Sequence, residues 1–433
     1  MNIDGNCISV ISEYIPDYIS FGLVSRQFRE SWVGENESSI NLFEKYVRDG
    51  NLDMVKYYIQ NGCPIDDYSP ISATECGHLE ILKFLISEGF ELDEEICKFA
   101  AFNGHIDIIK WARSQGCPWD DCTTSSAAEG GHLDILQYVT SEGCPWDNSM
   151  CTSAAIGGNL EILKYTISKG SKLDEYVCRY AAFGGHLEIL KYARSQNCPW
   201  DEDNICAYAT RGGHIEVLKW ARLQGCPWDE KVCKKAAKYG HLEILKWAKE
   251  QGCPWDEDEI CTYAIRNGHM EVLKWALLQG CTYDKSDCLY AVTNGKLEIL
   301  KWLKLEGYPF DEEACLYAVY SGNLKILQWL RLQGYEWDER ICEIAAKNGH
   351  LDILKYARSQ NCTWNERVCE IAAFHGNLEI LQYAISENCP WNEEACEASA
   401  KNGYIELKLN KCPCSQSRGD QLEVVRWIRK MHQ

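Results

Sequence analysis

The hydrophobic positions of this chain fall into blocks that each predict two short helices. In one block, Val232, Cys233, Ala236 and Ala237 lie at i, i+1, i+4 and i+5, which is one face of a helix. After Gly240, apolar residues follow helical spacing around more than half of a second helix. The alternation of apolar and polar residues that is typical of strands does not occur. The pattern therefore predicts an all-α chain of helix–turn–helix units.

Polar residues and glycines mark the ends of these predicted helices. Asp229 stands where it can cap the first helix, and Gly240 suits the left-handed position that ends it. His241, or Asn in sister blocks, begins the second helix. Glu243 and Lys246 are spaced as an i,i+3 ion pair on the solvated stripe of that helix.

A glycine followed by a polar residue, usually His or Asn, recurs through nearly the whole chain. Of the 13 intervals between these glycines, 11 are 27 residues and two are 28 residues. Such a period is the signature of a solenoid, in which each unit packs on its neighbours. The glycines are Gly50, Gly77, Gly104, Gly131, Gly158, Gly185, Gly213, Gly240, Gly268, Gly295, Gly322, Gly349, Gly376 and Gly403.

The last block departs from the period after Gly403. Removing residues 407–423 would restore "GYIEVVRWIRK", a normal second helix. We therefore predict an insertion at 407–423, either an unstructured excursion or an error in the gene model. The cysteines in it, Cys412 and Cys414, form only C-x-C, which is too little for a zinc site.

The recurring pattern, as in "AAKYGHLEILKWAKEQG", resembles the ankyrin repeat over roughly residues 40–433. The family unit has about 33 residues, so the resemblance implies that these shorter units have truncated hairpin fingers. The Thr-Pro-Leu-His opening of the family's first helix is also absent. The resemblance implies a protein-binding array, whose first helices line the concave surface that grips partners. It also suggests a viral-like origin, because such arrays are common in large DNA viruses of protists and in some protists.

The first 45 residues differ from the repeats, and Ile8 to Trp32 resembles an F-box. The resemblance implies binding of a Skp1-type adaptor, and so a link to a cullin ubiquitin ligase. The opening Leu-Pro of that family is missing, and the linker after Pro16 is about two residues short. The alternative is that residues 1–45 only cap the array of residues 46–433. The positions that would contact the adaptor are Ile15, Pro16, Leu23, Val24, Phe28 and Trp32.

Charge and cysteine content narrow the class of partner and the compartment. The net charge is −20, which opposes binding to nucleic acid and to anionic lipid. No segment approaches the roughly 18 apolar residues of a membrane span, and the N-terminus has no secretory pattern. The 25 cysteines are odd in number, so they cannot all pair within one chain. We expect reduced thiols in a cytoplasmic monomer, in the host cytoplasm if the protein is viral.

Metal, cofactor and catalytic chemistry are not indicated. Cys226, Cys233 and His241 recur in sister blocks, but adjacent helices lie about 8–10 Å apart, too far for equivalent residues to share a metal ion. Tyr308 replaces one recurring cysteine, and Lys296 replaces one histidine. The cysteines are therefore interpreted as small buried apolar residues. No phosphate loop, nucleophile elbow or unique triad stands out, so we expect no cofactor and no enzyme.

Tryptophans on the second helices, such as Trp220 and Trp247, are expected in the core. Those of the loops, such as Trp200 and Trp228, are interpreted as a ladder in which each packs on the next repeat. The alternative is a row of exposed anchors for a partner. The ladder is favoured because a long exposed aromatic row would promote aggregation.

The candidate binding residues are positions of the first helix where the blocks differ from one another. Tyrosine beside charged residues makes a plausible protein-binding groove. The alternative is that the tyrosines pack between neighbouring first helices. The candidates are Arg179, Tyr180, Tyr208, Lys234, Lys235, Tyr263, Tyr290 and Tyr317.

The sequence thus predicts a non-catalytic protein-binding scaffold. A more specific hypothesis makes it a substrate receptor of a cullin-type ubiquitin ligase. The alternative is a plain scaffold or sequestering protein in which residues 1–45 only form a cap, and a metal-binding protein or enzyme is a third reading.

Overall fold

A computed structural model describes residues 37–61, 68–146, 149–200, 204–283, 285–307, 313–337, 339–409 and 415–430. These ranges contain helices and turns and no strand. The chain divides into two compact units, and the boundary in the sequence lies between Pro227 and Trp228. None of the described helices is both long and apolar enough to span a membrane.

In the first unit, the helices are α3 (Glu37–Arg48), α4 (Leu52–Gln60), α5 (Ser69–Glu75), α6 (Leu79–Ser87), α7 (Glu94–Asn103), α8 (Ile106–Ser114), α9 (Asp121–Gly130), α10 (Leu133–Ser141), α11 (Met150–Ile156), α12 (Leu160–Ser168), α13 (Glu175–Gly184), α14 (Leu187–Ser195), α15 (Ile205–Gly212) and α16 (Ile215–Leu223).

In the second unit, the helices are α17 (Glu230–Tyr239), α18 (Leu242–Glu250), α19 (Glu257–Asn267), α20 (Met270–Leu278), α21 (Lys285–Thr293), α22 (Leu297–Leu305), α23 (Ala314–Tyr320), α24 (Leu324–Leu332), α25 (Arg340–Asn348), α26 (Leu351–Ser359), α27 (Glu366–His375), α28 (Leu378–Ser386), α29 (Glu393–Leu409) and α30 (Ser415–Lys430).

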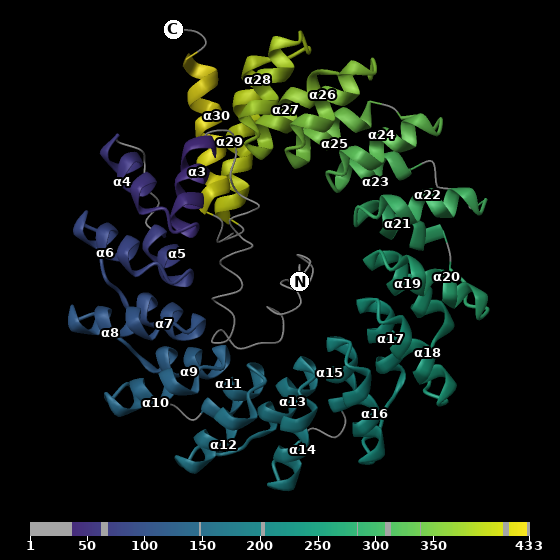
Figure 1. The fold of residues 1–433 in the computed structure, drawn as a ribbon. Coiled ribbons are helices and arrows are strands. Elements are labelled where there is room, and N and C mark those ends of the chain that lie inside the picture. Colours follow the sequence, from purple (N-terminus) through teal and green to yellow (C-terminus); the bar gives the residue numbers. More distant parts are fainter. Residues whose placement is uncertain are drawn as a thin grey trace. The chain divides into compact units, whose positions relative to one another are not determined.

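Helices with odd labels are the first helices of the repeats, and those with even labels are the second helices. Within each unit, successive first helices pack against one another, as α7 does on α9 and α17 does on α19. Each first helix also packs against the second helix that follows it, so every unit has two layers (Figure 1). The all-α solenoid of helix–turn–helix repeats is confirmed.

The repeat around α17 and α18 shows why this sequence forms these helices. The Asp229 carboxylate accepts a hydrogen bond from the backbone N–H of Lys231 at 2.9 Å, as expected of a cap. Gly240 ends α17 with φ +79°, the left-handed conformation that glycine adopts without strain. Lys246 Nζ lies 2.9 Å from Glu243 Oε1, so the predicted i,i+3 ion pair forms.

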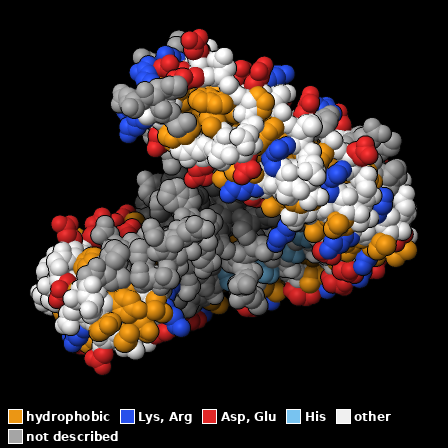
Figure 2. Space-filling model, turned by 90° about the horizontal axis from the view of Figure 1, so that it is seen from above, with side chains coloured by type: hydrophobic (Ala, Val, Ile, Leu, Met, Phe, Trp, Pro, Cys, Tyr) orange, Lys and Arg blue, Asp and Glu red, His pale blue; other side chains and the backbone are white. Residues whose placement is uncertain are grey.

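The core lies between the two layers and consists of small and branched residues. Buried residues of α17 are Val232, Cys233, Ala236 and Ala237, which form its predicted face, and those of α18 are Ile244, Leu245 and Ala248. Small side chains on the first helices let neighbouring repeats approach closely. On the face seen in Figure 2, acidic and basic side chains are interspersed with hydrophobic ones.

Two details concern the ends of the array. The boundary expected at residue 45 falls inside α3, whose Phe43 and Val47 are buried, so this helix packs with α4 and α5 as part of the array. Gly403 does not end a helix, because α29 continues to Leu409. Residues 407–409 and 415–423 of the expected insertion are helical, in α29 and α30.

Candidate functional site

In the first unit, the predicted binding residues lie on α13 and α15, two neighbouring first helices. The Arg179 guanidinium lies 4.8 Å from the ring centre of Tyr176 and 5.2 Å from that of Tyr208. Tyr180 and Tyr208 are half-buried, whereas Tyr176 is exposed. Burial raises the pKa of Tyr180, so its hydroxyl stays protonated at neutral pH. The rings of Tyr176 and Tyr208 thus flank one cation on the first-helix surface.

In the second unit, the predicted residues run over α17, α19, α21 and α23. Lys234 forms ion pairs with Glu259 on the next first helix and with Glu230, the latter at 3.5 Å. These pairs raise the pKa of Lys234, the bond to Glu259 being the main cause. Lys235 is half-buried beside it, and its position corresponds to that of the tyrosines on the following helices.

The tyrosines of this unit are both packed and accessible. Tyr263 and Tyr317 are half-buried, whereas Tyr290 is 38% exposed. The guanidinium of Arg266 lies 3.9 Å from the ring centre of Tyr290. Tyr290 thus fits both sequence interpretations, because its ring contacts a neighbouring cation and is still partly exposed.

A stretch of small polar residues interrupts the aromatic row in the first unit, a feature that sequence reasoning missed. Ser126 and Ser153 stand on α9 and α11 where α13 and α15 carry Tyr180 and Tyr208. Next to them, burial raises the pKa of Glu129 to about 7, while the Ser153 hydroxyl, 3.5 Å away, acts in the opposite direction. Aligning the repeats would have shown Glu129 as one of two acidic residues, with Glu75, at a position where most sister blocks place aromatic or basic residues.

The F-box-like residues Ile15, Pro16, Leu23, Val24, Phe28 and Trp32 lie outside the described residues.

The loop tryptophans form the predicted ladder. Trp200 meets Trp220 of the next second helix edge-on, with ring centres 5.8 Å apart, and the Arg194 guanidinium lies 4.2 Å from its ring centre. Trp337 has equivalent contacts with Tyr356 and Arg331. Each such loop ring therefore sits between a cation of one second helix and an aromatic ring of the next.

The tryptophans of the second helices are half-buried rather than fully in the core. This holds for Trp220 and Trp247, whose rings receive the edge contacts of loop tryptophans Trp200 and Trp228. The expectation of core tryptophans was wrong, because the ladder runs along the side of the array rather than between its layers.

The His or Asn before each second helix links neighbouring repeats, which sequence reasoning also missed. His186 Nε2 lies 3.2 Å from the carbonyl oxygen of Ile156, and His105 Nε2 lies 3.1 Å from that of Glu75. Where Asn replaces His, the Asn377 amide donates to the Ala346 carbonyl at 2.7 Å. Each contact supplies a hydrogen-bond partner for a carbonyl group at the end of the first helix of the preceding repeat. Carbonyl groups at a helix end have no partner within the helix.

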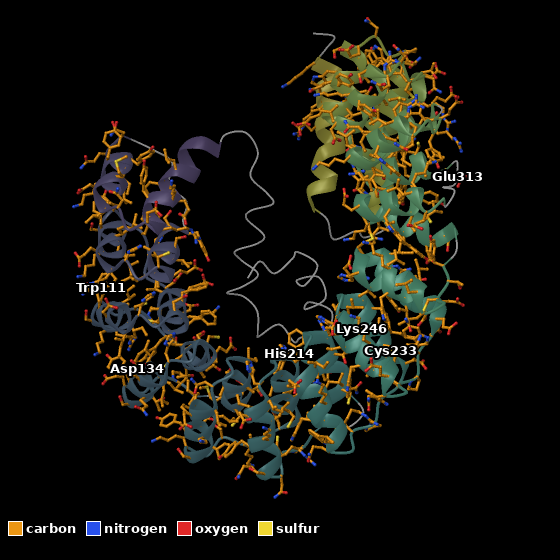
Figure 3. The ribbon with its side chains drawn as sticks, turned by 45° about the vertical axis from the view of Figure 1, so that its right-hand side comes forward. Trp111, Asp134, His214, Cys233, Lys246 and Glu313 are labelled. Carbon is orange, nitrogen blue, oxygen red and sulfur yellow. The ribbon has the colours of Figure 1, made fainter. Side chains whose placement is uncertain are left out.

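The imidazole rings lie against the glycines that mark the period. A Cβ added to Gly158 would lie 2.4 Å from His186 Cε1, and one added to Gly185 would lie 2.4 Å from His214 Nδ1. These glycines are therefore required twice, for their left-handed backbone and for the ring of the next repeat. Figure 3 labels His214 before α16, and Cys233 on α17.

The recurring cysteines are buried in pairs within the repeats. Cys97 Sγ lies 3.7 Å from Cys117 Sγ, and the Cys117 thiol donates to the carbonyl oxygen of Asp93 at 3.0 Å. Nineteen of the 21 cysteines in the described ranges are buried, in line with their interpretation as small apolar residues. The same contact joins Cys178 to Cys198, Cys233 to Cys253, Cys261 to Cys281, Cys342 to Cys362 and Cys369 to Cys389.

Among the described residues, one group has spacing that could hold a metal ion. The ligand atoms of Asp120, Asp121 and Cys122 lie within 4.8 Å of one another. The three are consecutive at the start of α9, where acidic residues favour a helix N-terminus. Burial and the two carboxylates raise the pKa of the Cys122 thiol to about 11. Acidic side chains at this position are expected without a bound ion, although Asp120 makes no side-chain capping bond to α9.

Comparison with known families gives one match. Residues 233–277, from within α17 to within α20, match the family described as ankyrin repeats (many copies). This segment is similar to ankyrin repeats, and it consists of the same helix–turn–helix units that recur along the described residues. No curated protein matches the chain. Ankyrin repeats mediate binding of protein partners, and an all-helical ankyrin-like architecture is typically a non-enzymatic binding scaffold.

Proposed function

We propose that this ankyrin-like protein is a non-catalytic scaffold that binds protein partners through the side chains of its first helices. The supporting observation is the row of half-exposed tyrosines beside charged groups on α19, α21 and α23. Tyrosine offers a large contact area and a polar tip, and it is enriched where proteins bind one another. Arg179 with Tyr180 and Tyr208 extends the same chemistry to the first unit, and Lys234 and Lys235 add cations.

The test compares the chain with a variant whose tyrosines are replaced by the residue that sister repeats use. In the triple variant Tyr263→Ser, Tyr290→Ser and Tyr317→Ser, each serine occupies a position held by Ser126 or Ser153 elsewhere in the array. Both proteins are immobilised at equal amounts and exposed to eukaryotic cell extract, and the bound proteins are quantified by mass spectrometry.

We expect a set of proteins to be retained by the native chain and lost from the serine variant. Glu188→Gln on the second helix α14 is the matched control and should leave that set unchanged. Circular dichroism of each variant verifies that the helices persist. If the retained proteins are the same with and without the tyrosines, the first-helix surface is not the binding surface.

We further propose, on the sequence alone, that the F-box-like segment within residues 1–45 recruits a Skp1-type adaptor and makes the protein a substrate receptor of a cullin ubiquitin ligase. The rival is a plain scaffold or sequestering protein in which this segment only caps the array. Deletion of residues 1–36 leaves α3 complete, because that helix begins at Glu37. Loss of an adaptor and a cullin on this deletion would support the receptor role, and their absence from both samples would leave the scaffold.

We also propose that the protein acts as a monomer in the cytoplasm. The supporting observations are the large number of free thiols and the net charge of −20, which opposes self-association. Sedimentation of the reduced protein and imaging of the tagged chain in cells test the two statements separately.

A further inference from the structure

Three consecutive second helices of the second unit end in leucines that are almost fully exposed. Leu278 at the end of α20, Leu305 at the end of α22 and Leu332 at the end of α24 are 83%, 84% and 82% exposed. They follow one another at the period of the repeat, so they form a row across three adjacent helices. An exposed leucine forgoes the favourable free energy that its burial would give. Three exposed leucines in a row are therefore an unusual surface for a protein in water.

The fold does not need leucine at this position. Most sister repeats carry serine there, and the serine hydroxyl donates back to the carbonyl three residues earlier, as from Ser195 to Tyr192 at 2.7 Å. The leucines are therefore not explained by packing or by helix capping. The serines that make this bond are Ser87, Ser114, Ser141, Ser168, Ser195, Ser359 and Ser386.

An aromatic residue lies one turn before each leucine. Trp275, Trp302 and Trp329 precede the leucines by three residues, which places each pair on the same side of its helix, and all three are half-buried. The three leucines and the three tryptophans together are called the leucine strip below. The strip belongs to the second helices, so it is separate from the tyrosines of the first-helix surface.

The charge around the leucine strip is opposite to that of the chain. Helices α20, α22 and α24 carry five basic side chains against two acidic ones, and the exposed Glu306 directly follows Leu305, whereas the whole chain carries a net charge of −20. The two acidic residues, Glu271 and Glu298, are each paired with a lysine of the same helix, at 3.2 and 2.7 Å. Lys304, Lys325 and Arg331 make no ion pair with an acidic side chain among the described residues.

We propose that the leucine strip binds an acidic amphipathic helix of a partner protein. The leucines stand at the same position of successive repeats, whose first helices pack on one another at about 8–10 Å, whereas the second helices lie farther apart, so the spacing of the leucines is about 10 Å or somewhat more. Seven residues of an α-helix rise about 10.5 Å. A helix with apolar residues at i, i+7 and i+14 would therefore meet all three leucines when it lies across the three repeats, and acidic residues beside them would face the basic side chains.

Two other occupants fit the surface less well. A second copy of this chain would bring two basic strips together between molecules that each carry −20. An anionic membrane would attract the strip but would repel the rest of the chain. Both are outcomes of the test. The proposal goes beyond the scaffold function because it adds a second binding surface on the other layer of helices.

The test uses the full chain and a synthetic peptide of about 18 residues with three leucines seven residues apart and glutamate on the flanks. Binding of the labelled peptide is followed by fluorescence anisotropy. The variant is Leu278→Ser, Leu305→Ser and Leu332→Ser, which copies the sister repeats. Leu223→Ser is the matched control, since Leu223 is 83% exposed but lies in the first unit on α16.

We expect the native chain and the Leu223→Ser control to bind the acidic peptide equally. The triple variant should bind roughly 1,000-fold more weakly, since burial of each of the three leucines contributes roughly a factor of ten. A peptide with lysine in place of glutamate should bind weakly, and added salt should weaken the binding of the acidic peptide.

Absence of binding to the native chain, or equal binding by the triple variant, would overturn the proposal. Leucine-dependent dimers in sedimentation would assign the strip to a second copy, and leucine-dependent binding to phosphatidylserine vesicles would assign it to a membrane. Either result would also overturn it. The tyrosine variant leaves the leucine strip intact. The test of the first-helix surface can therefore fail without affecting the test of the leucine strip.

Discussion

The contact between His186 and Gly158 predicts how strongly one repeat depends on the next. A Cβ at Gly158 would lie 2.4 Å from the imidazole, and the backbone there has φ +73°. Gly143, in the turn after α10, has φ +80°, and a Cβ there would meet nothing within 4 Å. Alanine at the two positions therefore carries a similar backbone penalty, but only Gly158→Ala also displaces the ring.

The expected magnitudes follow from these contacts. Left-handed backbone costs alanine about 1–2 kcal/mol, so Gly143→Ala should lower the free energy of unfolding by about that amount. Gly158→Ala should lower it by about 1–2 kcal/mol more, because the hydrogen bond from His186 to the Ile156 carbonyl is lost and a buried carbonyl is left without its partner.

Urea unfolding followed by circular dichroism measures these changes. The double variant Gly158→Ala with His186→Ala removes the clash, so it should be more stable than the sum of the two single changes predicts, by about 1 kcal/mol or more. Equal destabilisation by Gly158→Ala and Gly143→Ala, together with additive double-variant energies, would refute the coupling of repeats through the imidazole.

Three further predictions concern titratable groups. Burial lowers the pKa of His186, so its stabilising contribution is present above the unfolded pKa near 6.5 and is lost as pH falls below it. Between pH 8 and pH 5, His186→Asn should therefore lose less free energy of unfolding than the native chain. Identical pH profiles of the two proteins would contradict this. Burial raises the pKa of Glu129 to about 7, so the folded protein loses stability as the pH rises from about 4.5 to 7 and this carboxyl ionises. The variant Glu129→Gln should therefore raise the urea midpoint of unfolding at pH 8 but not at pH 4. Burial raises the pKa of the Cys315 and Cys396 thiols to about 11. A disulfide reagent should therefore modify few cysteines in the native protein and the rest only after unfolding. Rapid modification of all cysteines in the native protein would contradict their burial.

The helices and their order could be predicted from the sequence because the same local signals recur in almost every repeat. Asp229, Gly240 and the pair of Glu243 with Lys246 act within one or two turns, so their roles are legible without tertiary information. The end of the array was harder to predict. Gly403 resembles its sister glycines, but glycine permits a left-handed turn without imposing one, and α29 continues through it.

The candidate site was only partly accessible to sequence reasoning. Positions of the first helix could be chosen because they vary between repeats, but whether Tyr263 or Tyr290 is covered depends on packing between helices. The bond from His186 to Ile156 spans 30 residues and needs the spacing of the repeats. The exposure of Leu305 also escaped prediction, because a leucine within an apolar helix is expected to be buried.

The measurement that tests the central claim most directly compares two deletions within the second unit. Deleting residues 351–377 removes one full period and joins His350 to Leu378, which restores the register of the repeats. Deleting residues 351–363 removes α26 and the loop after it, about half a period. In an array stabilised by nearest-neighbour contacts, the first deletion should retain helical circular dichroism and a cooperative urea transition, and the second should lose both around the break. Equal collapse in the two deletions would contradict the account.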